Sequence, residues 1–180
     1  MPDPLLLALR RVFGEENVIP EFSIAKEATD GFDTERHYAP EPDYAVRPFN
    51  LIGDIDENNR RIDNAIRRHS SLTATWSTRG FRSPLDLGYN PNPRVFLAIE
   101  KEFHNTRKHR LGSVINASVL GKLGVVACVG DEAYRSISRI KGYLDFVGER
   151  KGRHMWLAQN VIVLRIDDMI DTLNGYAAPD

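Results

Sequence analysis

Hydrophobic residues recur at helical spacing in several stretches of the chain. Leu5, Leu9 and Val12 predict a short amphipathic helix that ends near Gly14. A second apolar stripe follows Asp54, which can cap a helix by accepting hydrogen bonds from its first turn. The predicted helices cover residues 4–13, residues 54–69, residues 110–122, a segment that begins at Asp131, and a short segment that begins at Asp167 or Asp168.

Runs of β-branched, aromatic or continuously apolar residues predict the strands. The predicted strands cover residues 72–78, 84–89, 94–103, 123–129 and 160–166. The run from Leu123 to Val129 is nearly all apolar, which is typical of a central strand covered on both faces. The order of elements is a helix, an antiparallel β-meander and then β-α-β crossovers. It predicts an α/β fold with a mixed central β-sheet flanked by helices.

The length of 180 residues fits one domain with a core of its own. Within it, residues 1–50 have the pattern of an N-terminal helix followed by an acidic arm, which is interrupted by prolines and could form an interface. Residues 51–180 hold the predicted α/β core. We expect one compact domain overall.

The composition favours a cytoplasmic protein. No stretch approaches the roughly 18 consecutive apolar residues that a membrane-spanning helix needs. No basic region precedes the short apolar run near Met1, so we expect no signal peptide. The single cysteine, Cys128, lies within an apolar run, which favours a core residue over a nucleophile or a metal ligand.

The net charge of −1 conceals an uneven distribution of charge along the chain. Residues 1–58 contain 5 basic and 13 acidic residues, whereas residues 59–154 contain 18 basic and 8 acidic residues. Residues 155–180 contain 1 basic and 4 acidic residues. The middle segment could therefore present a basic face to nucleic acid, or it could be a solvated surface balanced by the acidic N-terminal part.

Two glutamates share one face of the predicted strand over residues 94–103. Side chains alternate between the two faces of a strand, so Glu100 and Glu102 point the same way. Lys101 points to the other side with the apolar residues. A predicted turn near residues 91–92 would make Asp86 a diagonal cross-strand neighbour of Glu100.

Three carboxylates that converge in this way repel one another unless a cation or nearby arginines neutralise them. Mg²⁺ or Mn²⁺ would do so, because hard cations prefer oxygen ligands. A wet hairpin face with glutamates paired to arginines is the alternative. The acids are followed at once by the basic turn over residues 105–110 and by an α-β unit, which favours the metal site.

Asp86, thirteen intervening residues and then Glu100-x-Glu102 on an apolar strand resemble the catalytic core of the PD-(D/E)xK nuclease superfamily. The branch that it resembles most is that of the type II restriction endonucleases in which glutamate replaces the usual lysine. The resemblance covers about residues 54–168. It implies a restriction-endonuclease-like fold and a Mg²⁺-dependent endonuclease that hydrolyses phosphodiester bonds in duplex DNA, working as a homodimer.

The resemblance also implies roles for individual residues. Asp86, Glu100 and Glu102 would be catalytic, and Asp86 and Glu100 would bind Mg²⁺ (or Mn²⁺) together with the backbone carbonyl of Lys101. Asp63 is the best-placed acid on the preceding helix to complete such a site. The basic residues that we expect to bind nucleic acid are Arg60, Arg61, Arg107, Lys108, Arg110 and Lys151.

Two other classes of function remain open at this point. The departure from lysine at Glu102 leaves room for a catalytically silent subunit with a nuclease fold that binds nucleic acid or takes part in an assembly. A pair of carboxylates could also serve a hydrolase that acts on sugars. The order of elements and the basic middle segment favour the nuclease.

Overall fold

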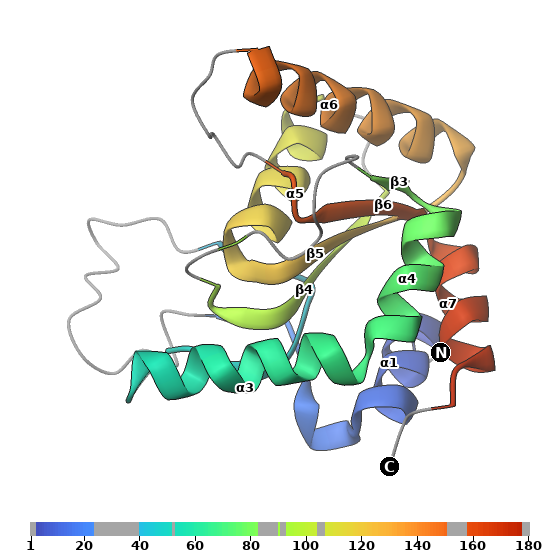
Figure 1. Cartoon of the computed structure of the whole chain (residues 1–180). Helices are drawn as coiled ribbons and strands as arrows, with labels where there is room; N and C mark the ends of the chain where they lie inside the picture. The colour runs from blue at the N-terminus through green and yellow to red at the C-terminus, as the bar shows by residue number, and fades with distance from the viewer. Residues whose placement is uncertain are drawn as a thin grey trace.

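One β-sheet with helices on both of its faces forms the protein (Figure 1). The computed structural model describes residues 3–23, 40–51, 53–82, 90, 93–103, 107–150 and 158–177. Its helices are α1 (Pro4–Phe13), the 3-10 helix η1 (Glu15–Asn17), α3 (Ile55–Arg68), α4 (Ser70–Arg79), α5 (Arg107–Leu120), α6 (Asp131–Arg150) and α7 (Ile166–Gly175). Its strands are β1 (Val18–Pro20), β2 (Tyr44–Phe49), β3 (Phe81–Arg82), β4 (Val95–Glu102), β5 (Gly121–Cys128) and β6 (Val161–Arg165).

The sheet is mixed, as predicted, with the strand order β1-β2-β4-β5-β6-β3. Strands β4, β5 and β6 are parallel and are linked by α5 and α6 as β-α-β crossovers. The antiparallel pairs are β1 with β2, β2 with β4, and β3 with β6. The apolar strand β5 therefore lies inside the sheet, with Cys128 buried, which confirms the prediction for this run.

Two layers of helices cover the sheet. On one face, Val114 of α5 and Ile137 of α6 pack against Val126 of β5. On the other face, α1, α4 and α7 pack against the neighbouring positions of the strands (Figure 1). Among the residues that the structure describes, no helix combines the length and the apolar character needed to cross a membrane.

Helix α4 replaces the strand that we predicted over residues 72–78. Leu72 and Trp76, four residues apart, are fully buried on one side of it. The hydroxyls of Thr73 and Thr75 donate to main-chain carbonyls three and four residues earlier, so the β-branched residues fit the helix. The prediction was wrong because burial of the two large side chains outweighs the strand propensity of the threonines.

Part of the expected acidic arm belongs to the sheet. Strand β2 lies between β1 and β4, and its residues Tyr44, Ala45 and Val46 are buried. Proline-rich flanks concealed this short strand from the sequence pattern. An arm outside the core is therefore the wrong description of residues 18–20 and 44–49.

The predicted hairpin between residues 84–89 and β4 also requires correction. Residues 83–89 lie outside the described part of the chain. Strand β4, however, pairs with β2 along residues 95–99 and with β5 along its whole length, so residues 95–99, which include the predicted partners of Asp86, are hydrogen-bonded to other strands on both edges. The cross-strand argument that placed Asp86 beside Glu100 therefore does not hold.

A buried polar network closes the C-terminal end of α5. The side-chain amide of Asn160, which is 1% exposed, donates to the carbonyls of Ser118 and Gly121 at 2.9 and 2.8 Å. Its oxygen accepts from the Ser118 hydroxyl at 2.9 Å, and this hydroxyl accepts from the amide N–H of Ala158 at 3.0 Å. Asn160 and Asn90, which donates to the same two carbonyls, thus satisfy main-chain acceptors at the junction of α5 and β5.

Replacement of Asn160 by alanine should lower the free energy of unfolding by about 1–3 kcal/mol, because the buried Ser118 hydroxyl would lose its acceptor and the carbonyls of Ser118 and Gly121 would lose one donor each and keep the hydrogen bonds from Asn90. Urea denaturation followed by circular dichroism measures the change. Asn174→Ala, at an exposed position of α7, is the matched control and should change stability by less than about 0.5 kcal/mol. Equal losses of stability in Asn160→Ala and Asn174→Ala would contradict the role of this network.

Candidate active site

The two glutamates of the predicted site lie at the C-terminal end of β4, where they face α5. Both are buried, with 7% of Glu100 and 1% of Glu102 exposed. They line a cavity of about 360 Å³. The remaining lining residues come from the end of β4, from the segment before β2, and from α5: Asp43, Lys101, Phe103, Lys108, His109, Gly112, Ser113 and Asn116.

The third carboxylate of this cavity belongs to Asp43. Because β2 is antiparallel to β4, the residue that precedes β2 lies beside the end of β4. The Oδ2 atom of Asp43 accepts a hydrogen bond of 2.6 Å from the backbone N–H of Lys101. Burial, and to a smaller extent the charge of Glu102, raise the pKa of Asp43 although this hydrogen bond lowers it.

Glu100 has the most perturbed environment of the three acids. Burial, and then the negative charge of Asp43, raise its pKa from 4.5 to about 8. A hydrogen bond with Asn116 opposes this shift, and the charge of Glu102 adds to it. The Oε1 atom of Glu100 is buried, and it has no hydrogen-bond partner among the residues that the structure describes. A buried carboxylate oxygen without a hydrogen bond needs a proton donor or a cation to replace the water that it has lost.

Helix α5 supplies the opposite wall of the cavity. The Ser113 hydroxyl donates a hydrogen bond of 2.7 Å to Oε2 of Glu102 and thereby fixes the orientation of that carboxylate. Ser113 and Asn116 are three residues apart, so both project from the same side of the helix. Lys108, one turn earlier, brings an exposed positive charge to the mouth of the cavity.

Lys101 has its side chain on the opposite face of the sheet, as strand alternation predicts. Its Nζ atom lies 2.8 Å from Oδ2 of Asp3. Asp3 also caps α1 by accepting from the N–H of Leu5, and its Oδ2 accepts from the hydroxyl of Tyr44. Lys101 is also among the residues that line the cavity, and a metal contact through its carbonyl stays a prediction.

Two other predicted metal ligands are not in the cavity as described. Asp63 lies on α3 and pairs with Lys122 at 3.0 Å, near the start of β5, whereas Glu100 and Glu102 are at the end of β4. The position of Asp63 therefore does not suit a shared metal site. Asp86 lies outside the described residues, and its role stays a prediction.

The predicted nucleic-acid-binding residues lie in different places. Lys108 borders the cavity, whereas Arg61 lines a separate pocket. Arg60 pairs with Glu57 on the exposed side of α3 at 2.7 Å. Arg110 is 5% exposed and pairs with Glu132 at 3.4 Å, so its guanidinium is not on an exposed basic surface. The side chain of Arg107 and the whole of Lys151 lie outside the described part.

Asp43 was not identified from the sequence, although a local signal marks this residue. It forms a Pro42-Asp43 pair immediately before the apolar residues Tyr44 to Val46. Its partner Lys101 is 58 residues away in the sequence. The Pro-Asp pair before a short apolar run is the signal that could have identified Asp43. Only the pairing of β2 with β4, however, brings Asp43 close to the glutamates.

The donor set suits a hard divalent cation. Within the described part of the chain, no three His, Cys, Asp or Glu side chains form a complete metal cage. Mg²⁺ requires fewer, because it usually binds one or two carboxylates and keeps several waters or takes substrate phosphate oxygens. The unpartnered oxygen of Glu100, with Asp43 beside it, meets that requirement.

Comparison with known proteins finds no matching protein-family model, no matching curated protein and no matching solved structure. The functional argument therefore depends on the geometry and electrostatics of the cavity. Its central element is Glu100, which is buried, unpartnered at Oε1 and adjacent to two other carboxylates.

The raised pKa of Glu100 predicts how stability depends on pH. In the absence of metal, the unfolded chain ionises this group near pH 4.5, whereas the folded protein keeps it protonated up to about pH 8. Its contribution to stability is therefore complete below pH 4.5 and is lost as the pH rises to 8, by about 1.4 kcal/mol per unit. With EDTA present, Glu100→Gln should equal the wild type near pH 5 and exceed its free energy of unfolding by about 2–4 kcal/mol at pH 8.5.

Urea denaturation of both proteins at the two pH values measures this difference. The comparison isolates Glu100 because the other titrating groups are common to both proteins. If the free energies of unfolding of the two proteins change in parallel between pH 5 and 8.5, Glu100 ionises normally. Mg²⁺ should reduce the gap at pH 8.5, because a cation stabilises the ionised carboxylate.

Proposed function

We propose that the protein is a Mg²⁺-dependent endonuclease that hydrolyses phosphodiester bonds, with duplex DNA as its substrate and a homodimer as its working form. The observation that carries the proposal is the group of Glu100, Asp43 and Glu102 around one cavity, with an unpartnered oxygen on Glu100. Perturbed carboxylates in a cleft are typical of a functional site. Pro42-Asp43 with Glu100-x-Glu102 also supports a resemblance to the PD-(D/E)xK superfamily, with Asp43 in the position that we first gave to Asp86.

The three carboxylates of the cavity, Ser113 and Lys108 have separate roles in this proposal. Glu100 and Asp43 would hold Mg²⁺ through carboxylate oxygens. The bound ion would supply Lewis acidity, which lowers the pKa of a ligand water and stabilises negative charge on the scissile phosphate. Glu102, oriented by Ser113, would hold the attacking water by accepting its hydrogen bond. Lys108 at the mouth would bind a phosphate of the same strand.

Cleavage of supercoiled plasmid by the purified protein tests the proposal. Cleavage should appear with Mg²⁺ or Mn²⁺ and disappear when EDTA is added. Linear duplex, single-stranded DNA and RNA of the same sequence should distinguish the substrate classes. Absence of cleavage for all four substrates in both metals would contradict the proposal.

A catalytically silent nuclease fold is the second candidate, and one observation favours it. No complete metal cage of three such side chains occurs within the described residues. Isothermal titration with Mn²⁺ distinguishes the two functions. An active centre should release heat that Asp43→Asn and Glu100→Gln remove, whereas a silent fold should bind nucleic acid without taking up metal.

A further inference from the structure

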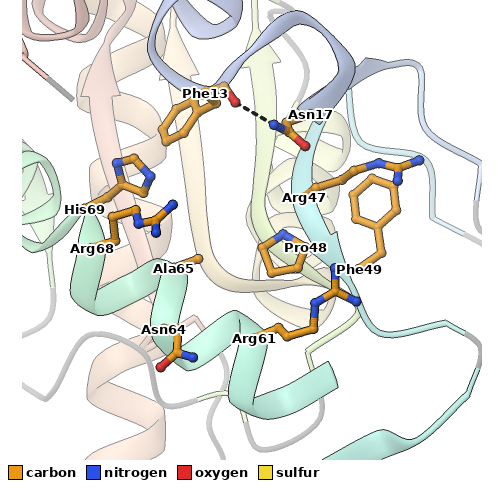
Figure 2. A pocket seen from close by; sticks show the side chains of 10 residues that line it. All are labelled: Phe13, Asn17, Arg47, Pro48, Phe49, Arg61, Asn64, Ala65, Arg68 and His69. Atoms are coloured by element: carbon orange, nitrogen blue, oxygen red, sulfur yellow. Dashed lines mark hydrogen bonds between the residues drawn. The ribbon is translucent and has the colours of Figure 1, made fainter. Parts of the chain in front are cut away.

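A second cavity, of about 560 Å³, opens between the end of α1, the end of β2 and one side of α3. Its volume is within the range of small-molecule sites. Figure 2 shows Arg68 and His69 at one end, Arg47 and Phe49 at the other, and Pro48 between them. The complete lining is Phe13, Asn17, Arg47, Pro48, Phe49, Arg61, Asn64, Ala65, Arg68 and His69.

Three guanidinium groups give this cavity its positive charge. Arg47, Arg61 and Arg68 are exposed, and the described part of the structure contains no ion-pair partner for any of them. None of the described residues that line the cavity is acidic, and the carboxylate of the neighbouring Glu16 accepts from the amide of Asn17 at 3.1 Å. The positive charge is therefore available to an outside anion.

The neighbouring arginines of α3 show that this arrangement is selective. Arg60 pairs with Glu57 at 2.7 Å, and Arg67 donates to the side chain of Asn64 at 2.6 Å. Neither of these two arginines lines the cavity. Arg61 and Arg68, which have the same spacing of seven residues, lie on the cavity side of the same helix, about 10 Å apart along its axis.

Aromatic contacts hold the walls in place. The guanidinium of Arg47 stacks over the ring of Phe49 at 5.0 Å, and that ring packs against Phe22 at 4.5 Å. His69 contacts the edge of Phe13 at 4.9 Å. Burial, and then the charge of Arg68, lower the pKa of His69, so the charge of the cavity at neutral pH comes from the arginines.

The cavity is separate from the candidate active site. Phe49 pairs with Val95 at the start of β4, whereas Glu100 lies five residues further on, about 17 Å along the strand. The walls of the cavity include Phe13 and Ala65, which pack on the face of the sheet that α1 covers. Glu100 and Glu102 face α5 on the other side. A phosphate in this cavity cannot be the scissile one.

We propose that this cavity binds consecutive phosphate groups, with Arg68 contacting one phosphate and Arg61 and Arg47 contacting the next. Guanidinium groups recognise phosphate through paired N–H donors. Their placement at both ends of the cavity fits a ligand with two linked anionic groups better than a single small anion (Figure 2). A nucleoside triphosphate and a nucleic-acid strand both carry this chemistry. The inference does not depend on the proposed nuclease activity.

Fluorescence anisotropy and isothermal titration with the full-length protein test the inference. The probes are ATP, inorganic tripolyphosphate, inorganic phosphate, and a labelled single-stranded 12-mer of DNA. EDTA is present throughout, so that metal at the acidic cavity does not contribute. Arg61→Ala/Arg68→Ala should weaken binding of the preferred probe by at least about tenfold. Inorganic phosphate alone should bind more weakly than tripolyphosphate.

Arg135→Ala/Arg139→Ala, at two exposed positions of α6, is the control with the same loss of two positive charges. It should change affinity by no more than about threefold, which is the effect of net charge alone. If Arg61→Ala/Arg68→Ala loses affinity for ATP and tripolyphosphate, the ligand is a free polyphosphate. If it loses affinity only for the 12-mer, the ligand is a nucleic-acid strand. Equal losses in the two double variants, or no binding of any probe by the wild type, would overturn the inference. Thermal melting confirms that both variants fold.

Discussion

Glu100→Gln is expected to reduce Mg²⁺-dependent cleavage of plasmid DNA by at least about 1,000-fold. Glutamine keeps the volume of the side chain but cannot supply a negatively charged oxygen to a cation. The same change removes a carboxylate whose pKa is raised to about 8, so the variant should be at least as stable as the wild type. Loss of activity therefore could not be attributed to unfolding.

Single-turnover cleavage at pH 8 with saturating Mg²⁺ measures the effect. Asp171→Asn, at an exposed position of α7, removes one negative charge elsewhere and should leave the rate within about twofold of the wild type. Cleavage by Glu100→Gln at the wild-type rate, with the EDTA control clean, would remove Glu100 from the mechanism and with it the proposed metal centre.

Lys141→Ala is expected to lower the free energy of unfolding by about 3–5 kcal/mol. Lys141 lies on α6 and is fully buried, and its Nζ atom contacts both oxygens of Asp145 at 2.7 Å. Alanine would leave the carboxylate of Asp145 buried without this cation. Helix α6 packs against β5 on one face of the sheet, so this loss of stability should affect the whole fold.

Urea denaturation at pH 7 measures this loss, with Arg139→Ala at an exposed position of the same helix as the control. The double variant Lys141→Met/Asp145→Leu should recover most of the stability, because apolar side chains of similar size remove both charges together. A double variant as unstable as Lys141→Ala would show that the lost stability comes from packing and not from the loss of the lysine charge beside the carboxylate of Asp145.

Local signals predicted those parts of the fold that depend on near neighbours in sequence. Helix α1 has the predicted bounds, and Asp54 caps α3 by accepting from the N–H groups of Asp56 and Glu57. Within α3, however, Ile55 is 62% exposed although it belongs to the predicted apolar stripe. Helix propensity and capping act within one or two turns, whereas the buried side of a helix depends on what packs against it.

In the candidate site, too, the features set by near neighbours in sequence were predicted, and the feature set by distant strand pairing was not. Alternation along β4 was enough to place Glu100 and Glu102 together and to direct Lys101 away from them. The third acid that the structure describes at the cavity, Asp43, was not predicted, because its identity depends on which segment pairs with β4. A turn next to the strand suggested Asp86, whereas the actual neighbour, β2, precedes β4 by a helical region that includes α3 and α4. Strand pairing over that distance leaves no periodic signal in the sequence.

Lys101 has a consequence for the order in which the protein folds. Its backbone N–H holds Asp43, 58 residues earlier, and its side chain holds Asp3, 98 residues earlier. Contacts between such distant parts of the chain form slowly, since the loop between them must close first. During synthesis on the ribosome, the contacts of Asp43 and Asp3 with Lys101 therefore cannot form until residue 101 has been added to the chain. The acidic cavity, whose lining extends to Asn116, likewise cannot form before α5 has been synthesised.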